Sequence, residues 1–207
     1  MIAEMSLLTG GMVYDAARAI TTGDMARARR VQHLATQLHA AQERLEFLAL
    51  RTAALKVSTP PAQHHLLRVN KITTSIARIG ENADMMAMRA CAGQGLPPAL
   101  CTCVATAAIS VQSLLEQAID AYIRGDGAAR QSAVHNTRVL TVCLHGRELL
   151  NASVGNRTAL TPQDLTALLT LQQLELMGEH VLAITHWLAY GRTPLTNPED
   201  NLPTRTE

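Results

Sequence analysis

Apolar residues recur at intervals of three and four along most of this chain, which is the spacing of one face of an α-helix. Two long stripes stand out in the first half: Val31, Leu34, Leu38, Ala41, Leu45 and Leu48, then Ile72, Ile76, Ile79, Ala83, Met86 and Ala90. Asp24 directly precedes the first stripe and is placed to cap its helix. Between the stripes, the segment STPPAQ (58–63) predicts a break, because proline disfavours a continuous helix.

The second half of the chain shows the same order of elements. The pattern predicts helices over about residues 99–124 and 126–154, separated by Gly125. A third helix opens at TPQD (161–164), where Thr161 can cap, proline fits the first turn and Asp164 complements the helix dipole. Its final stripe ends before residue 191 and consists of Leu174, Met177, Val181, Ile184 and Leu188.

Short sequences from the two halves can be aligned with each other. SIARIGENAD (75–84) and QLELMGEHVL (173–182) carry a Gly-Glu pair in the same apolar register, and a Gly-Asp pair begins at residue 23 and again at residue 125. Repetition of one supersecondary unit at a fixed period predicts tandem packing. We therefore expect an all-α fold of two tandem three-helix bundles, residues 1–95 and 96–192, followed by a disordered polar tail, residues 193–207.

Composition supports helices and excludes several classes of partner. Of the 207 residues, 47% are hydrophobic but only 2% are aromatic, which suits packed helices better than strands. A net charge of +1 gives no electrostatic reason to bind nucleic acid or an anionic membrane. The sequence shows no basic signal-peptide start and no obvious apolar run of the roughly 20 residues that span a bilayer, so we expect a cytoplasmic protein.

Cysteine and histidine give little support for a metal site. CTC (101–103) has no second Cys/His pair at zinc-finger spacing. We therefore interpret the four cysteines as buried thiols and not as metal ligands. His180 and His186 are six residues apart and therefore lie on different helix faces. No P-loop, nucleophile elbow or dinucleotide fingerprint occurs, so we expect no catalytic residues and no enzyme activity.

Four segments carry a resemblance to a known family. IARIGENADMM (76–86) and LELMGEHVLAI (174–184) resemble the L-E-R-I-G-D-x-A-x-x-I signature of the PhoU family, while GGMV (10–13) and PPAQHHLLRV (60–69) resemble its other conserved segments. The likeness extends over about residues 7–190. It implies two three-helix bundles and a negative regulator of phosphate uptake and phosphate homeostasis.

The partners implied by this resemblance are a phosphate ABC transporter and a sensor histidine kinase. The protein would act as a non-enzymatic adaptor in signal transduction between them, and would approach the membrane only through its partners. Broad Ala/Leu helix faces of this kind also favour a homodimer.

The family's metal-binding motif is incomplete in this chain. Members hold iron or zinc clusters with a Glu and an Asp four residues apart in the signature, a spacing that lets two carboxylates share a cation. The first copy has Ala77 in place of the Glu and retains Glu81, whereas the second copy retains Glu175 and Glu179. These three glutamates are the candidate metal ligands, and a solvated helix face is the alternative for them.

The helices that precede the signatures offer few further ligands. At the positions expected to be acidic, the first half has Ala35 and His39, and the second has Thr137 and Arg138, whose charge would oppose a cation. The sequence therefore predicts no certain cofactor and at most a weakly bound divalent ion. The alternative function is a helical-bundle metal-binding protein or carboxylate metalloenzyme, although the Glu-x-x-His motif of di-iron bundles is missing at Glu175 and Glu179.

Overall fold

The computed structural model describes residues 1–54, 60–125, 129–155 and 159–190. These residues form six helices and no strand, which confirms the all-α prediction. The helices are α1 (Ile2–Thr22), α2 (Met25–Ala54), α3 (Pro60–Cys91), α4 (Pro98–Arg124), α5 (Ala129–Val154) and α6 (Pro162–Tyr190). The predicted tail, residues 193–207, lies outside the described residues.

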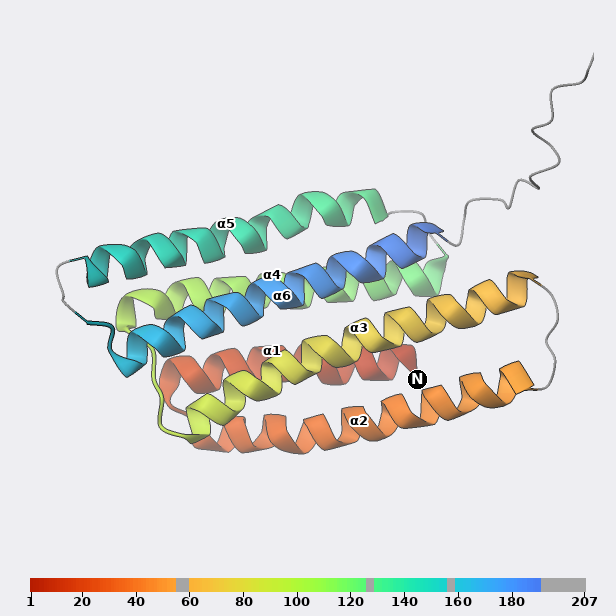
Figure 1. Ribbon diagram of the computed structural model, residues 1–207, viewed down its shortest axis with the longest axis horizontal. Helices are drawn as coiled ribbons and strands as arrows, with labels where there is room; N and C mark the ends of the chain where they lie inside the picture. The colour runs from red at the N-terminus through yellow and green to blue at the C-terminus, as the bar shows by residue number, and fades with distance from the viewer. Residues whose placement is uncertain (55–59, 126–128, 156–158, 191–207) are drawn as a thin grey trace, which may run out of the picture.

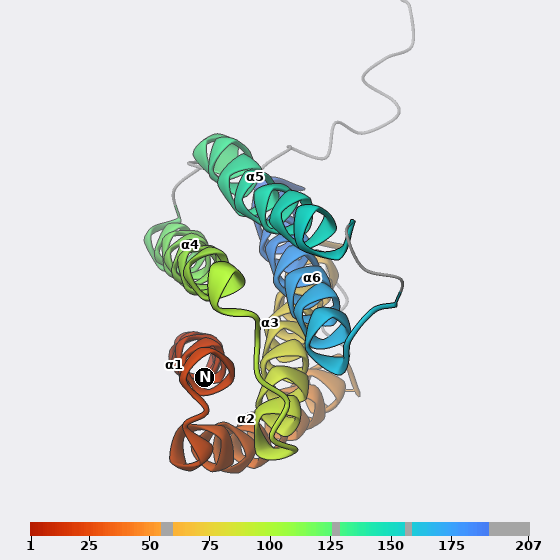
Figure 2. The ribbon, with the colours of Figure 1, turned by 90° about the vertical axis from the view of Figure 1, so that its left-hand side faces the viewer.

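The two halves lie side by side and share one interior, instead of following each other in a row. Helices α1, α3, α6 and α4 form a ring in which each packs on the next, while α2 packs on α1 and α3, and α5 packs on α4 and α6 (Figure 2). Consecutive helices run in opposite directions (Figure 1). Because one hydrophobic cluster runs through all six helices, the domain boundary near residue 95 stays a prediction.

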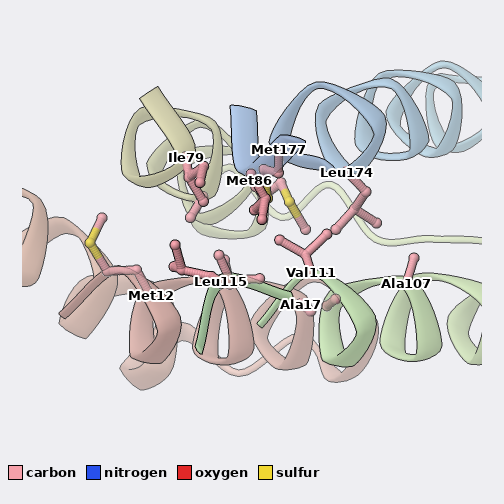
Figure 3. Packing of buried hydrophobic residues seen from close by; sticks show 14 of the residues in the cluster. Met12, Ala17, Ile79, Met86, Ala107, Val111, Leu115, Leu174 and Met177 are labelled. Carbon is pink, nitrogen blue, oxygen red and sulfur yellow. The ribbon is translucent and has the colours of Figure 1, made fainter. Parts of the chain in front are cut away.

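Aliphatic and methionine side chains fill this interior. Ile79, Met86, Leu174 and Met177 on α3 and α6 point toward side chains of α1 and α4, among them Val111 (Figure 3). All five of these side chains are fully buried. Unbranched methionine adapts to irregular gaps between helices, which explains how a core with very few aromatic residues can still be closely packed.

The repeated Gly-Asp turn has the same local geometry where both copies are described. Gly23 and Gly125 follow α1 and α4 in the left-handed conformation, with φ of 72° and 68°, which favours glycine. Asp24 caps α2 as predicted, since its Oδ1 accepts hydrogen bonds from the backbone N–H groups of Ala26 at 3.0 Å and Arg27 at 3.1 Å. The C-terminal ends of α1 and α4 lie at opposite ends of the molecule because the two halves run antiparallel (Figure 1).

Two helix starts show what proline and threonine contribute. Helix α3 begins at Pro60, so the prediction that the whole segment STPPAQ interrupts the helix was wrong. Backbone N–H groups in the first turn of a helix have no acceptor within the helix, so proline, which lacks this group, is common there. Thr161 caps α6 as expected: its Oγ1 accepts a hydrogen bond from the Asp164 backbone N–H at 3.2 Å, and the Asp164 carboxylate accepts one from Thr161 N at 2.8 Å.

Helix α4 corrects one expectation about membrane spans. By length and composition Pro98–Arg124 is apolar enough to cross a membrane, which inspection of the sequence had not revealed. Half of its apolar window is buried in the structure, where the helix packs on α1, α5 and α6. A helix that is buried in a protein core can have the same composition.

Candidate functional site

The two Gly-Glu motifs lie on α3 and α6, which pack against each other. His180 of the second motif is half-buried at this seam. Burial lowers its pKa below the ordinary value and the charge of Arg78 lowers it further, whereas Glu179 and Glu81 act in the opposite direction. The imidazole is therefore within electrostatic reach of charged groups from both copies of the motif, a proximity that no spacing within either copy could predict.

The first copy borders a shallow pocket of about 70 Å³ between α2 and α3. The pocket brings together the four residues that the sequence placed at the first candidate metal position, Ala35, His39, Ala77 and Glu81, along with Leu38, Gln42, Gly80 and Asp84. Glu81 is exposed, and its carboxylate pairs with the Arg78 guanidinium on the same helix at 2.7 Å. His39 is likewise exposed and lies 3.3 Å from the carboxylate of Glu43.

Asp84 also lines this pocket, whereas the sequence pattern favours a solvent-facing or capping position for it. It is half-buried, and its Oδ1 is buried with no hydrogen-bond partner in the described part of the chain. Burial raises the pKa of Asp84 above the ordinary value for aspartate. Its position three residues after Glu81 puts both carboxylates on one helix face, which was the available sequence signal.

The second copy places a carboxylate against an arginine from α5. Glu175 is partly buried, and its carboxylate forms an ion pair with the Arg147 guanidinium. Burial raises the pKa of Glu175, Arg147 opposes this shift, and the Glu179 carboxylate reinforces it. Because burial is the largest of these effects, the ion pair does not fully compensate the carboxylate for the water it loses.

The arginine beside Glu175 is not the one expected from the sequence. Arg138 lines a different pocket, between α4 and α5. Residues 138 and 147 are nine apart, or about 2.5 helical turns, so they point to opposite sides of α5. Only Arg147 faces α6, and the expectation that Arg138 would lie beside the second candidate metal position was wrong.

Within the described residues, no group of three or more His, Cys, Asp or Glu side chains could hold a metal ion. The four cysteines are free thiols: Cys103 and Cys143 are buried, while Cys91 and Cys101 are half-buried. Burial raises the pKa of Cys143 to about 12, so its thiol stays protonated at neutral pH. The candidate carboxylates thus fall into two separate sets, and in each set one carboxylate pairs with an arginine.

Comparison with known proteins identifies the fold. The sequence matches no family model and no curated protein. The structure is similar to the crystal structure of PhoU from Pseudomonas aeruginosa, with a TM-score of 0.85 over 92% of each chain and 22% sequence identity. The chain has the PhoU fold. This confirms, at the level of the fold, the resemblance inferred from the two Gly-Glu motifs.

Proposed function

We propose that this protein is a non-enzymatic regulator of phosphate uptake and phosphate-starvation signalling. It would act in the cytoplasm as an adaptor between a phosphate ABC transporter and a sensor histidine kinase. The observation that carries the proposal is the likeness to PhoU from Pseudomonas aeruginosa along 92% of the chain. Because a fold alone does not determine function, the surface of the bundle must also suit an adaptor.

Exposed apolar side chains on α3 and α6 are consistent with such a role. Met85 and Met88 on α3 are 43% and 47% exposed, and Leu165, Leu168 and Leu176 on α6 are 50%, 39% and 36% exposed. The two helices pack on each other, and Arg89 of α3 donates a hydrogen bond to Gln173 of α6 across their seam. Exposed methionine and leucine clusters mark protein interaction sites, so we infer that a partner, or a second copy in a homodimer, contacts this surface.

The alternative of a metal-binding bundle or carboxylate metalloenzyme receives less support from the same region. Arg78 neutralises Glu81, and Arg147 neutralises Glu175. A guanidinium beside Glu81 and another beside Glu175 oppose a cation at those two positions. The regulator is therefore the function that we propose for the chain.

Deletion of the gene tests this function in the organism that carries it. Phosphate-scavenging genes should become active in phosphate-rich medium, and the wild-type gene supplied on a plasmid should restore their repression. Met85→Asp together with Met88→Asp should fold but fail to restore repression, whereas Leu144→Asp, at an exposed position on α5, serves as the matched control. Phosphate genes that stay silent in the deletion strain would refute the proposal.

A further inference from the structure

A pocket between α4 and α5 lies apart from the Gly-Glu motifs. Its volume is about 350 Å³, and its described lining comprises Thr106, Ile109, Ser110, Ser113, Leu114 and Gln117 from α4 and Arg138 from α5. Sites for small molecules in proteins have volumes of roughly 300 to 1,000 Å³. The pocket therefore has room for a compact organic molecule.

The only charge among the described lining residues is positive. Arg138 is exposed and forms no ion pair or hydrogen bond with another described residue, in contrast to Arg147 on the same helix. The nearest acidic residue in sequence on α4, Glu116, is not among the described lining residues, and its carboxylate accepts a hydrogen bond from Gln112 at 3.0 Å. No described carboxylate in the lining offsets the Arg138 guanidinium.

Hydroxyl groups provide further hydrogen-bond donors around this guanidinium. Ser113 Oγ accepts a hydrogen bond from Gln117 Nε2 at 3.1 Å, so the hydroxyl hydrogen of Ser113 stays available. Thr106 has no side-chain hydrogen bond to a described residue, whereas Ser110 donates its hydrogen to the Thr106 carbonyl at 2.9 Å. A guanidinium with nearby hydroxyl donors is suited to a carboxylate or a phosphate group.

The same pocket offers an apolar wall. Ile109 is 57% exposed although it is a large aliphatic residue, and Leu114 beside it is almost fully buried. We propose that the α4–α5 pocket binds a small organic oxyanion, a carboxylate or a phosphate monoester. Arg138 and Ser113 hold its anionic group, and Ile109 contacts its apolar part. This site does not depend on the proposed regulatory function.

Isothermal titration calorimetry of the full chain at low salt tests this site. Phenyl phosphate and benzoate probe the two anionic groups, and benzyl alcohol is the uncharged control. We expect at least one of the two anions to bind with one molecule per chain, and the difference between them identifies the preferred group. Arg138→Ala should weaken this binding by at least about tenfold, since it removes hydrogen bonds from a charged donor. Arg138→Lys should retain part of it.

A second arginine supplies the matched control. Arg29 on α2 is also exposed and has no ion pair with a described residue, so Arg29→Ala makes the same change of charge away from the pocket. It should leave binding unchanged, while Ser113→Ala should weaken it severalfold with an unchanged melting temperature. Absence of binding by both anions at millimolar concentration would overturn the proposal. Equal loss in the Arg29 and Arg138 variants, or equally tight binding of benzyl alcohol, would also overturn it.

Discussion

Gly80 of α3 lies directly against Leu38 of α2, so closely that a Cβ atom on residue 80 would stand 2.2 Å from Leu38 Cδ2. Ordinary carbon contacts are about 3.5 to 4.0 Å long, so only glycine fits unless Leu38 moves. The glycine of the first Gly-Glu motif therefore allows Leu38 of α2 to pack closely on α3. It also lies at the base of the pocket that Glu81 and Asp84 line.

Gly80→Ala should destabilise the protein by about 1–3 kcal/mol, because the added methyl group overpacks this contact. Urea unfolding followed by circular dichroism measures the change. Gly11→Ala in α1 is the matched control, since a Cβ there meets no atom within 4 Å and alanine favours a helix. The double variant with Gly80→Ala and Leu38→Ala should lose less free energy of unfolding than the sum of the losses in the two single variants. A Gly80→Ala variant as stable as the wild type would contradict this packing role.

Asp15→Asn should lower the free energy of unfolding by about 1–2 kcal/mol. The Asp15 side chain is only 6% exposed, and its carboxylate pairs with Arg27 at 2.6 Å and Arg30 at 3.5 Å across the α1–α2 turn. Chemical denaturation provides the measurement. As a control, Glu43→Gln removes an exposed carboxylate that pairs with His39, and should change stability by less than about 0.5 kcal/mol. Equal effects from the two substitutions would show that the burial of Asp15 does not increase the contribution of its ion pairs to stability.

Asp84→Asn should raise stability at neutral pH, and this advantage should disappear in acid. Burial raises the pKa of Asp84 in the folded protein, so the folded state binds its proton more tightly than the unfolded state does. The loss of stability caused by the ionised Asp84 is fully present above the pKa of the folded state. It is absent below the pKa of the unfolded state, 3.8. Urea midpoints of wild type and variant, measured from pH 7 down to pH 3.5, should converge. A constant difference across this range would exclude the titration of Asp84 as its source.

Metal content should be low in protein purified without chelator. Glu175 and Glu81 each pair with an arginine, and their remaining oxygens could hold at most one weakly bound ion with water. Elemental analysis should find fewer than two iron or zinc ions per chain. Arg147→Ala should increase binding at Glu175 and Glu179 by removing the competing charge, whereas Arg138→Ala should not. Two or more tightly bound ions in the wild-type protein would show that other ligands replace the missing carboxylates.

Residues within one or two helical turns determined the features that the sequence predicted correctly. The apolar stripes placed the helices because a period of 3.6 puts residues three and four apart on one face. The caps at Asp24 and Thr161 depend on backbone groups two or three residues away. The repeated glycine turns could be found in the same way, since a left-handed residue after a helix favours glycine wherever the helix packs.

Tertiary structure alone decided which distant side chains meet. Three features depend on how neighbouring helices are rotated and aligned. Glu175 pairs with Arg147 and not with Arg138. Asp15 is buried beside Arg27, and α1, α3, α6 and α4 close into one ring. A periodic stripe defines the buried face of a helix but not the axial register of its neighbour. Contacts at the edges of that face therefore depend on the combined packing of many residues, which a single stripe does not specify.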